Sequence, residues 1–209
     1  MKGKYLAFDG IDYSGKSTQA RLLAEYLRKK NIDCVETREP GGTNIGKSIR
    51  ATLLDERNNR MEPITELLLF EASRNQLFEE VIIPSIERGE HVVSDRSYIS
   101  TEAYQGYGRG MNMGTIKYLN EMTTRGIKPD LAIILDFSVE EALALKRDRD
   151  RIEQWALENH GKFFDRVRDG FLEIAKQNAD FCVVIERGKK RIEEIHEEVK
   201  YRVKKRFEL

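Results

Sequence analysis

The sequence predicts an α/β fold in which a parallel sheet of five strands carries helices on both faces. Short apolar runs have the length and composition of buried strands, and at least one helical pattern separates each run from the next. The chain has 209 residues, 40% of them hydrophobic, so it can bury one core, and we expect a single domain over residues 1–209. The predicted strands lie near 4–9, 33–37, 91–95, 131–136 and 181–185.

A phosphate-binding loop follows the first predicted strand. Residues 10–17 read GIDYSGKS and match G-x-x-x-x-G-K-[ST] directly after an apolar run. Glycine lets successive backbone N–H groups converge on phosphate oxygens. In such loops the lysine places a positive charge on the β- and γ-phosphates, and the hydroxyl can bind the Mg²⁺ that bridges them. The predicted nucleotide-binding residues are Gly10, Ile11, Asp12, Tyr13, Ser14, Gly15, Lys16, Ser17 and Thr18.

Helical patterns follow the loop and the second strand. Apolar residues between 22 and 27 fall at helical spacing. The longest pattern opens at Glu62-Pro63, because proline suits a first helical turn, and we expect Pro84 to interrupt it. Its apolar residues exceed one face. One stripe can therefore pack on the sheet while another meets a second subunit, so a homodimer and a wholly internal helix both stay open.

Charged side chains follow two further strands where those strands end. Arg38 comes at the end of the second strand, and Asp95 and Arg96 come at the end of the third. In sheets of this type ligands bind at the carboxyl ends of the strands, so these side chains are expected beside the phosphate loop. The planar guanidinium grips a phosphate with two hydrogen bonds. The edge therefore suits a ligand with more than one phosphate group.

Composition narrows the choice of partner. Lysine plus arginine and aspartate plus glutamate both number 36, so no overall positive field recruits nucleic acid, and a small phosphorylated molecule is expected instead. No apolar stretch approaches the ~20 residues of a membrane span. The first strand begins within a few residues of Met1, which leaves no room for a signal sequence, so we expect a cytoplasmic protein. Cys34 and Cys182 lie in apolar runs and are expected to be free thiols.

Several motifs together carry a family resemblance. GIDYSGKST, TREPGGT, LLLFEASRNQL, SDRSYISTEAYQGYGRG, KPDLAIILD and DRIE occur in this order, and the set resembles the thymidylate kinase (dTMP kinase) family from about residue 3 to about residue 175. The phosphate loop alone indicates only a superfamily, whereas F-x-x-S-R followed by D-R-x-x-x-S-x-x-A-Y-Q-G indicates this kinase. The resemblance implies a three-layer P-loop kinase fold with a short lid. It also implies that ATP and Mg²⁺ serve to convert dTMP to dTDP on the route to dTTP.

The resemblance also implies roles for single residues. Asp12 resembles the carboxylate on the 3'-hydroxyl, and Phe70 resembles the ring that stacks on thymine. Arg74 resembles the donor to the thymine carbonyl; it lies four positions after Phe70, hence on the same helix face. On helical spacing alone, a plain core residue is the alternative interpretation of Phe70. The implied metal site is Ser17 with Asp95. The implied acceptor site comprises Asp12, Arg38, Pro40, Phe70, Ser73, Arg74, Arg96, Ser100, Thr101, Tyr104 and Gln105.

A run of alternating charges, Lys146 to Arg151, resembles the lid that the family closes over ATP. If the run is helical, Arg147 and Arg151 share a face; if it is extended, Arg149 joins them. A solvated, self-paired charge run is the alternative. We expect the lid at about 146–153. The predicted catalytic residues are Lys16, Arg96, Arg147, Arg149 and Arg151.

The acceptor chemistry needs no general base, because a monophosphate with a second pKa of ~6 is mostly dianionic at neutral pH. Three other functions are alternatives. A deoxynucleoside kinase would use Glu39 as a base on a 5'-hydroxyl, but Arg38 and the A-Y-Q-G run argue against it. A GTP-hydrolysing switch would need N-K-x-D after a strand, and Lys128-Pro129-Asp130 precedes one. A catalytically silent nucleotide-binding protein is disfavoured because every expected site residue is present.

Overall fold

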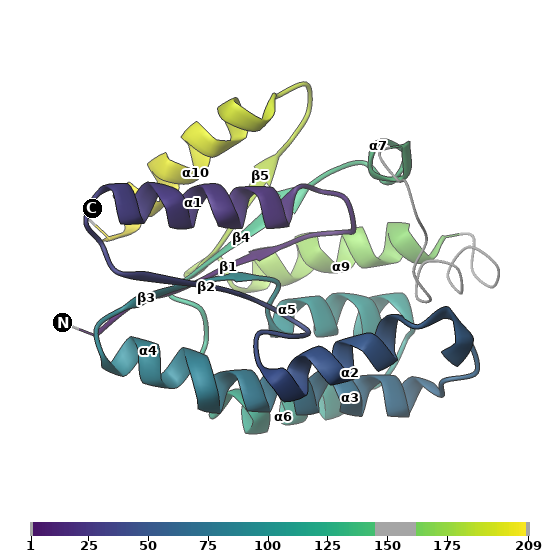
Figure 1. The fold of residues 1–209 in the computed structure, drawn as a ribbon. Helices are drawn as coiled ribbons and strands as arrows, with labels where there is room; N and C mark the ends of the chain where they lie inside the picture. The colour runs from purple at the N-terminus through teal and green to yellow at the C-terminus, as the bar shows by residue number, and fades with distance from the viewer. Residues whose placement is uncertain (1, 145–161, 208–209) are drawn as a thin grey trace.

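The computed structural model describes residues 2–144 and 162–207. Five parallel strands form one sheet in the order β2-β3-β1-β4-β5 (Figure 1). The predicted sheet is therefore confirmed, with strand ends within a residue or two of those expected. The strands are β1 (Tyr5–Asp9), β2 (Cys34–Arg38), β3 (His91–Asp95), β4 (Leu131–Asp136) and β5 (Cys182–Glu186).

Helices cover both faces of the sheet, as expected. The α-helices are α1 (Lys16–Lys29), α2 (Asn44–Leu54), α3 (Pro63–Leu77), α4 (Ile83–Glu87), α5 (Tyr98–Thr101), α6 (Met113–Thr124), α7 (Val139–Ala144), α9 (Phe163–Gln177) and α10 (Ile192–Phe207). A 3₁₀ turn covers Glu56–Asn58, and π-helical turns cover Phe78–Ile82 and Glu102–Gly108. In Figure 1, α1 and α10 lie above the sheet, whereas α2, α3, α4, α5, α6 and α9 lie below it. Within the described residues, no helix has the length and apolar character needed to cross a membrane.

β1 is buried on both faces, which explains its continuous apolar sequence. Leu6 and Phe8 pack in a cluster with residues of α1 and α10. Tyr5 and Ala7 point to the opposite face, where they cluster with Phe78. Successive strand side chains alternate between faces, so a central strand between two helical layers needs apolar residues at every position.

The long helix that begins after Glu62 does not end at Pro84, contrary to the sequence expectation. α3 runs through a π-helical turn into α4, which ends at Glu87. Proline lacks an N–H and crowds the carbonyl four residues earlier, which normally breaks the helix. Here the N–H of Ile83 donates to the carbonyl of Phe78, five residues back, so the wider turn just before Pro84 relaxes the regular spacing. The chain can then continue in the same direction.

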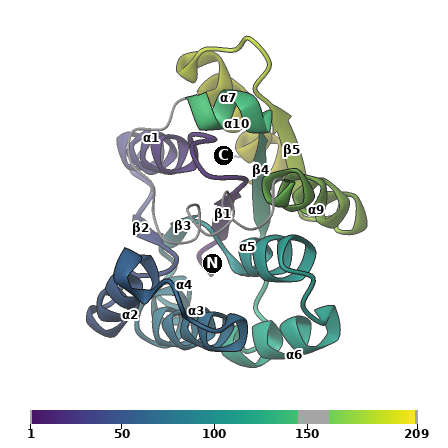
Figure 2. The ribbon, with the colours of Figure 1, turned by 90° about the vertical axis from the view of Figure 1, so that its right-hand side faces the viewer.

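The order of the strands places a ligand crevice at the end of β1. This strand has β3 on one side and β4 on the other, so the connections diverge at its carboxyl end. Ligands of open α/β sheets bind at such a switch point. Figure 2 looks towards this edge. The pairing of Arg38 with Asp95 across β2 and β3 brings the ends of these strands level.

Candidate active site

The phosphate loop connects β1 to α1 at the switch point. Gly10 and Gly15 have φ angles of 138° and 87°, which favour glycine. A Cβ atom on Gly10 would lie 2.5 Å from the carbonyl oxygen of Leu135, so the neighbouring strand also excludes a side chain there. Tyr13 has a φ of 62°, an uncommon value for a non-glycine residue. The loop is therefore a tight turn whose positive φ angles direct its backbone towards the crevice.

Lys16 lies in this loop with its ammonium group turned inwards. Nζ donates to the carbonyl oxygen of Ile11 at 2.6 Å, and the residue is only 5% exposed. Burial, followed by the charge of Arg96, lowers the pKa of Lys16 to about 8. A phosphate placed at the loop would add negative charge beside this buried cation and favour its charged form.

Ser17 and Asp95 form an oxygen-rich pair beside the loop. Ser17 Oγ donates to Asp95 Oδ2 at 2.5 Å. The other oxygen, Asp95 Oδ1, is buried and has no hydrogen-bond partner among the described residues. The same residues contain no cluster of three or more His, Cys, Asp or Glu side chains that could hold a metal. Mg²⁺ is commonly held by one or two carboxylates together with phosphate oxygens and water, so this pair fits such an ion.

Arg96, Asp12 and Tyr104 form a compact cluster. Arg96 has a φ of 78° and directs its guanidinium to Asp12 Oδ1 and to Ser100 Oγ, the latter at 3.1 Å. The guanidinium lies 5.1 Å from the centre of the Tyr104 ring, whose hydroxyl donates to Asp12 Oδ2 at 2.6 Å. Burial acts to raise the pKa of Asp12, but Arg96 and Lys16 hold it below its usual value. Asp12 is therefore an ionised acceptor.

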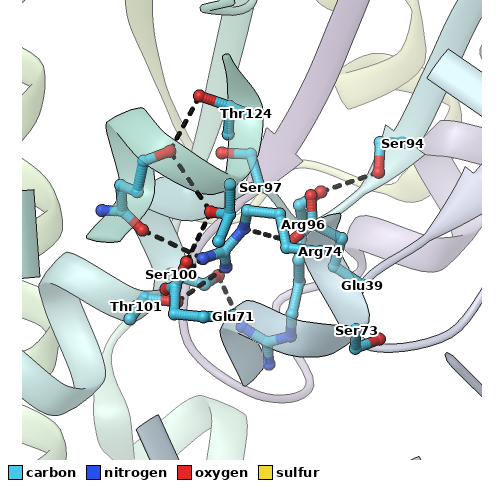
Figure 3. Close-up of polar contacts among 12 residues, drawn as sticks. Glu39, Glu71, Ser73, Arg74, Ser94, Arg96, Ser97, Ser100, Thr101 and Thr124 are labelled. Atoms are coloured by element: carbon cyan, nitrogen blue, oxygen red, sulfur yellow. Dashed lines mark hydrogen bonds and ion pairs between the residues drawn. The ribbon is translucent and has the colours of Figure 1, made fainter. Parts of the chain in front are cut away.

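Arg74 is the centre of a buried polar network (Figure 3). It is 2% exposed, and its Nε donates to Glu39 Oε2 at 2.7 Å. Nη1 donates to Glu71 and, at 2.9 Å, to Asn120 Oδ1. Nη2 donates to Thr101 Oγ1 at 2.7 Å. These contacts fix the guanidinium plane against the cavity wall.

Two adjoining cavities open at this edge, and both are lined by Asp12, Glu39, Arg50 and Arg96. We call the first the acceptor cavity; its remaining lining residues are Pro40, Leu54, Phe70, Arg74, Ser97, Ser100, Thr101, Tyr104 and Gln105. We call the second the phosphate cavity; its remaining lining residues are Tyr13, Gly15, Lys16, Ser17, Thr18, Arg38 and Asp95. The shared residues mark the boundary where two bound phosphorylated ligands would meet.

The structure gathers most of the predicted acceptor residues around these cavities. Arg38 lines the phosphate cavity, with Nη2 3.8 Å from Asp95 Oδ2. Ser73 lines neither cavity; its hydroxyl accepts a hydrogen bond of 3.1 Å from the N–H of Gly41 and so supports the loop after β2. The predicted lid, about 146–153 with Arg147, Arg149 and Arg151, lies outside the described residues.

Sequence reasoning missed some lining residues. Arg50 reaches both cavities from α2 and donates to the carbonyl of Pro40 at 3.1 Å. The sequence could have indicated Arg50, because the segment that forms α2 directly follows the loop after β2, and its first turns therefore lie near the site. From the sequence, Glu39 was considered only as the general base of the alternative function, a deoxynucleoside kinase. Burial, against the opposing effect of Arg74, raises the pKa of Glu39 to about 7.

A third cavity lies on the other side of the phosphate loop, and we call it the loop-side cavity. The guanidinium of Arg187 lies 4.3 Å from the centre of the Phe137 ring there. No sequence motif indicated this pairing, because the two residues follow different strands. The cavity is lined by Tyr13, Ser14, Gly15, Thr18, Gln19, Phe137, Arg187, Ile192 and Ile195.

The phosphate loop lines one cavity, and Arg50 and Arg96 border both this cavity and a second one. This arrangement defines a P-loop kinase that acts on a small phosphorylated acceptor. A family model described as thymidylate kinase matches residues 8–199. The chain belongs to the thymidylate kinase family.

Individual relatives agree over nearly the full length. The chain is 42% identical over 207 residues to a thymidylate kinase of Thermoanaerobacter sp. (strain X514), covering 98% of this chain and 99% of that protein. It is 44% identical over 200 residues to a thymidylate kinase of Kosmotoga olearia, covering 93% and 92%. A crystal structure of thymidylate kinase from Ehrlichia chaffeensis superposes with a TM-score of 0.79 at 36% identity, covering 98% of this chain and 99% of that one.

Proposed function

We propose that this protein transfers the γ-phosphoryl group of ATP to dTMP, giving dTDP and ADP, in the synthesis of dTTP. The observation that carries the proposal is the common wall of the two cavities. Arg50 and Arg96 border both, so they can neutralise the acceptor phosphate beside the transferring group. Because phosphoryl transfer depends chiefly on positioning and charge stabilisation, such a wall provides the main requirement.

The donor is assigned to the phosphate loop. The loop amides and Lys16 would hold the ATP phosphates, and the loop-side cavity would take the adenine, since Phe137 and Arg187 offer it a flat apolar and cationic surface. Ser17 and Asp95 would hold Mg²⁺, as their oxygen donor set allows. When bound, the ion would neutralise and orient phosphate oxygens.

The acceptor is assigned to the acceptor cavity. Thymine would stack on Phe70 with Arg74 donating to its carbonyl, while Asp12 would accept from the 3'-hydroxyl. The dianionic phosphate, held by Arg38 and Arg96, supplies the attacking oxygen. A bond forms from this oxygen to the γ-phosphorus as the bond from the γ-phosphorus to the β,γ-bridging oxygen breaks, and ADP leaves with that oxygen. Lys16 and Arg96, which line the same cavity, would stabilise the charge of the transferring group.

An ADP-release assay with a panel of acceptors tests this function. We expect ATP-dependent turnover with dTMP and weaker turnover with dUMP, since an apolar methyl contact is worth only about 1 to 3 kcal/mol. Thymidine should not be an acceptor. Turnover of thymidine without turnover of dTMP would favour instead the deoxynucleoside kinase with Glu39 as base.

Tyr104 is expected to select deoxyribose. A 2'-hydroxyl would press against its ring and lose solvation. Tyr104→Ala should therefore narrow the preference for dTMP over its ribo counterpart, measured as the ratio of kcat/KM values. Tyr104→Phe is the matched control: it keeps the ring, which packs edge-on against Phe163 and Phe171 at 6.2 and 6.1 Å, and should keep the ratio. An unchanged ratio of kcat/KM values in Tyr104→Ala would show that the Tyr104 ring does not select the sugar.

The proposed lid arginines should act on the transition state. Single alanine variants of Arg147, Arg149 and Arg151 should lower kcat with little change in KM for dTMP in at least one case, because the lid would close on charge that develops during transfer. Arg125→Ala, at a side chain 62% exposed, is the control. Full kcat in all three lid variants would leave the segment as a solvated charge run.

We also propose a cytoplasmic homodimer. Large exposed apolar side chains lie on α2, α3 and α6, which are side by side in Figure 2: Ile45, Ile64, Leu68, Tyr118 and Met122. Exposed apolar side chains on neighbouring helices are typical of an interface. Sedimentation equilibrium should give twice the chain mass, and a monomer at micromolar concentration would contradict this assembly.

The proposed cytoplasmic location rests on the proposed nucleotide substrates, which are intracellular, and cell fractionation tests it.

A further inference from the structure

We propose that the buried ion pair of Glu66 and Arg109 sets the direction of the Gln105 amide, so that the acceptor cavity recognises the imino N3–H of a keto pyrimidine. The pair is a positioning device, since Gln105 lines the cavity and the pair does not. This inference rests on the proposed function and deepens it, because it names how the base is selected.

The three side chains form one contiguous buried group. Glu66 lies on α3 with its side chain 0% exposed, and the side chain of Arg109 is 4% exposed. Arg109 donates from Nε to Glu66 Oε1 and from Nη2 to Oε2, both at 2.8 Å. Gln105 is 2% exposed, and its Nε2 donates to Glu66 Oε1 at 2.9 Å. Gln105 and Arg109 lie at the π-helical turn Glu102–Gly108 and its C-terminal end, four positions apart.

The chemistry of Glu66 decides the orientation of the amide. A carboxylate that receives two hydrogen bonds from a guanidinium has only acceptor sites left. The opposite orientation of Gln105 would set its carbonyl oxygen against a carboxylate oxygen, two acceptors with no proton between them. The amide nitrogen is therefore held on Glu66. The carbonyl oxygen Oε1 is left to the acceptor cavity.

An acceptor from Gln105 and a donor from Arg74 then line the same cavity. Thymine and uracil offer the matching pattern, because N3–H donates and the neighbouring carbonyl accepts. Cytosine offers the reverse, since its N3 accepts and its amino group donates. A site built around buried hydrogen bonds rejects a mismatched ligand strongly, because its own polar groups are left unpaired.

Stability alone does not account for the pair. Replacing a buried ion pair with apolar residues of similar volume is often neutral or stabilising. Orientation of the Gln105 amide explains why the pair is ionic. A carboxylate at Glu66 accepts hydrogen bonds but cannot donate one, so it excludes the orientation in which the Gln105 carbonyl faces it.

The test compares kcat/KM for dTMP and for dCMP in Glu66→Gln and in the native protein. A glutamine at 66 can donate as well as accept, so the Gln105 amide is free to turn. We expect the dTMP/dCMP ratio to fall by about tenfold or more, chiefly through a higher KM for dTMP. Glu62→Gln, the same change at an exposed position at the start of the same helix, should leave the ratio unchanged.

Thermal unfolding is measured in parallel, because Glu66→Gln leaves Arg109 buried without its anion. The double variant Glu66→Met with Arg109→Met avoids that cost and should lose the same discrimination. A ratio that stays within twofold of the native value in either folded variant, even if both acceptors slow together, overturns the inference and makes the pair structural. Failure of the native protein to phosphorylate dTMP would instead overturn the proposed function.

Discussion

Replacing Lys16 with alanine should lower kcat for dTMP by on the order of a hundredfold or more, because it removes a fixed cation from the transferring phosphoryl group. The measurement is steady-state ADP release at saturating dTMP and ATP. Lys29→Ala removes the same charge from the exposed end of the same helix and should keep native turnover. Native-like turnover in Lys16→Ala would show that the loop is not the donor site.

Folding should survive this substitution, and its pH dependence has a defined sign. Burial lowers the pKa of Lys16 from 10.5 to about 8, so the folded state disfavours the charged lysine. The resulting loss of unfolding free energy is fully present below pH 8. It disappears as the pH rises from about 8 towards 10.5, because in this range the unfolded chain binds more protons than the folded chain. The melting temperature of Lys16→Ala should therefore equal or exceed the native value at pH 7. This advantage should shrink at pH 9.5.

Replacing Arg74 with alanine should cost about 3 to 5 kcal/mol of unfolding free energy, because it leaves the buried carboxyl groups of Glu39 and Glu71 without their cation. Glu39 and Glu71 are 5% and 2% exposed, so neither can turn to water without opening the core. Denaturant-induced unfolding measures the loss. Base discrimination should fall as well, since the donor on the cavity wall is removed, while the preference for deoxyribose should stay largely intact.

A charge-balanced variant separates the two effects of Arg74. Combining Arg74→Met with Glu39→Gln and Glu71→Gln removes all three charges and should recover much of the stability. It should not recover selection of dTMP over dCMP. A stability of Arg74→Ala within about 1 kcal/mol of the native value would mean that the network contributes little, since a broken buried pair costs far more.

Local patterns were sufficient for the strands, the phosphate loop and the family. A strand buried on both faces needs an unbroken apolar run, as in Tyr5 to Phe8, and a loop that directs its amides at phosphate needs glycine where φ is positive, as at Gly10. Both requirements act on neighbouring residues and are therefore visible in the sequence. The arginines at the ends of β2 and β3 could be placed at the same edge for a similar reason, because parallel strands end together.

Tertiary structure decided that the helix continues past Pro84 and that Ser73 supports a loop and does not line the cavity. It also decided that Arg50 on α2 lines the cavity and that Gln105 contacts Glu66, 39 positions away in the sequence. Whether a polar side chain lines a cavity or supports its wall depends on which helix packs beside it. That packing is set by the sum of many long-range contacts, and no local period or spacing encodes it.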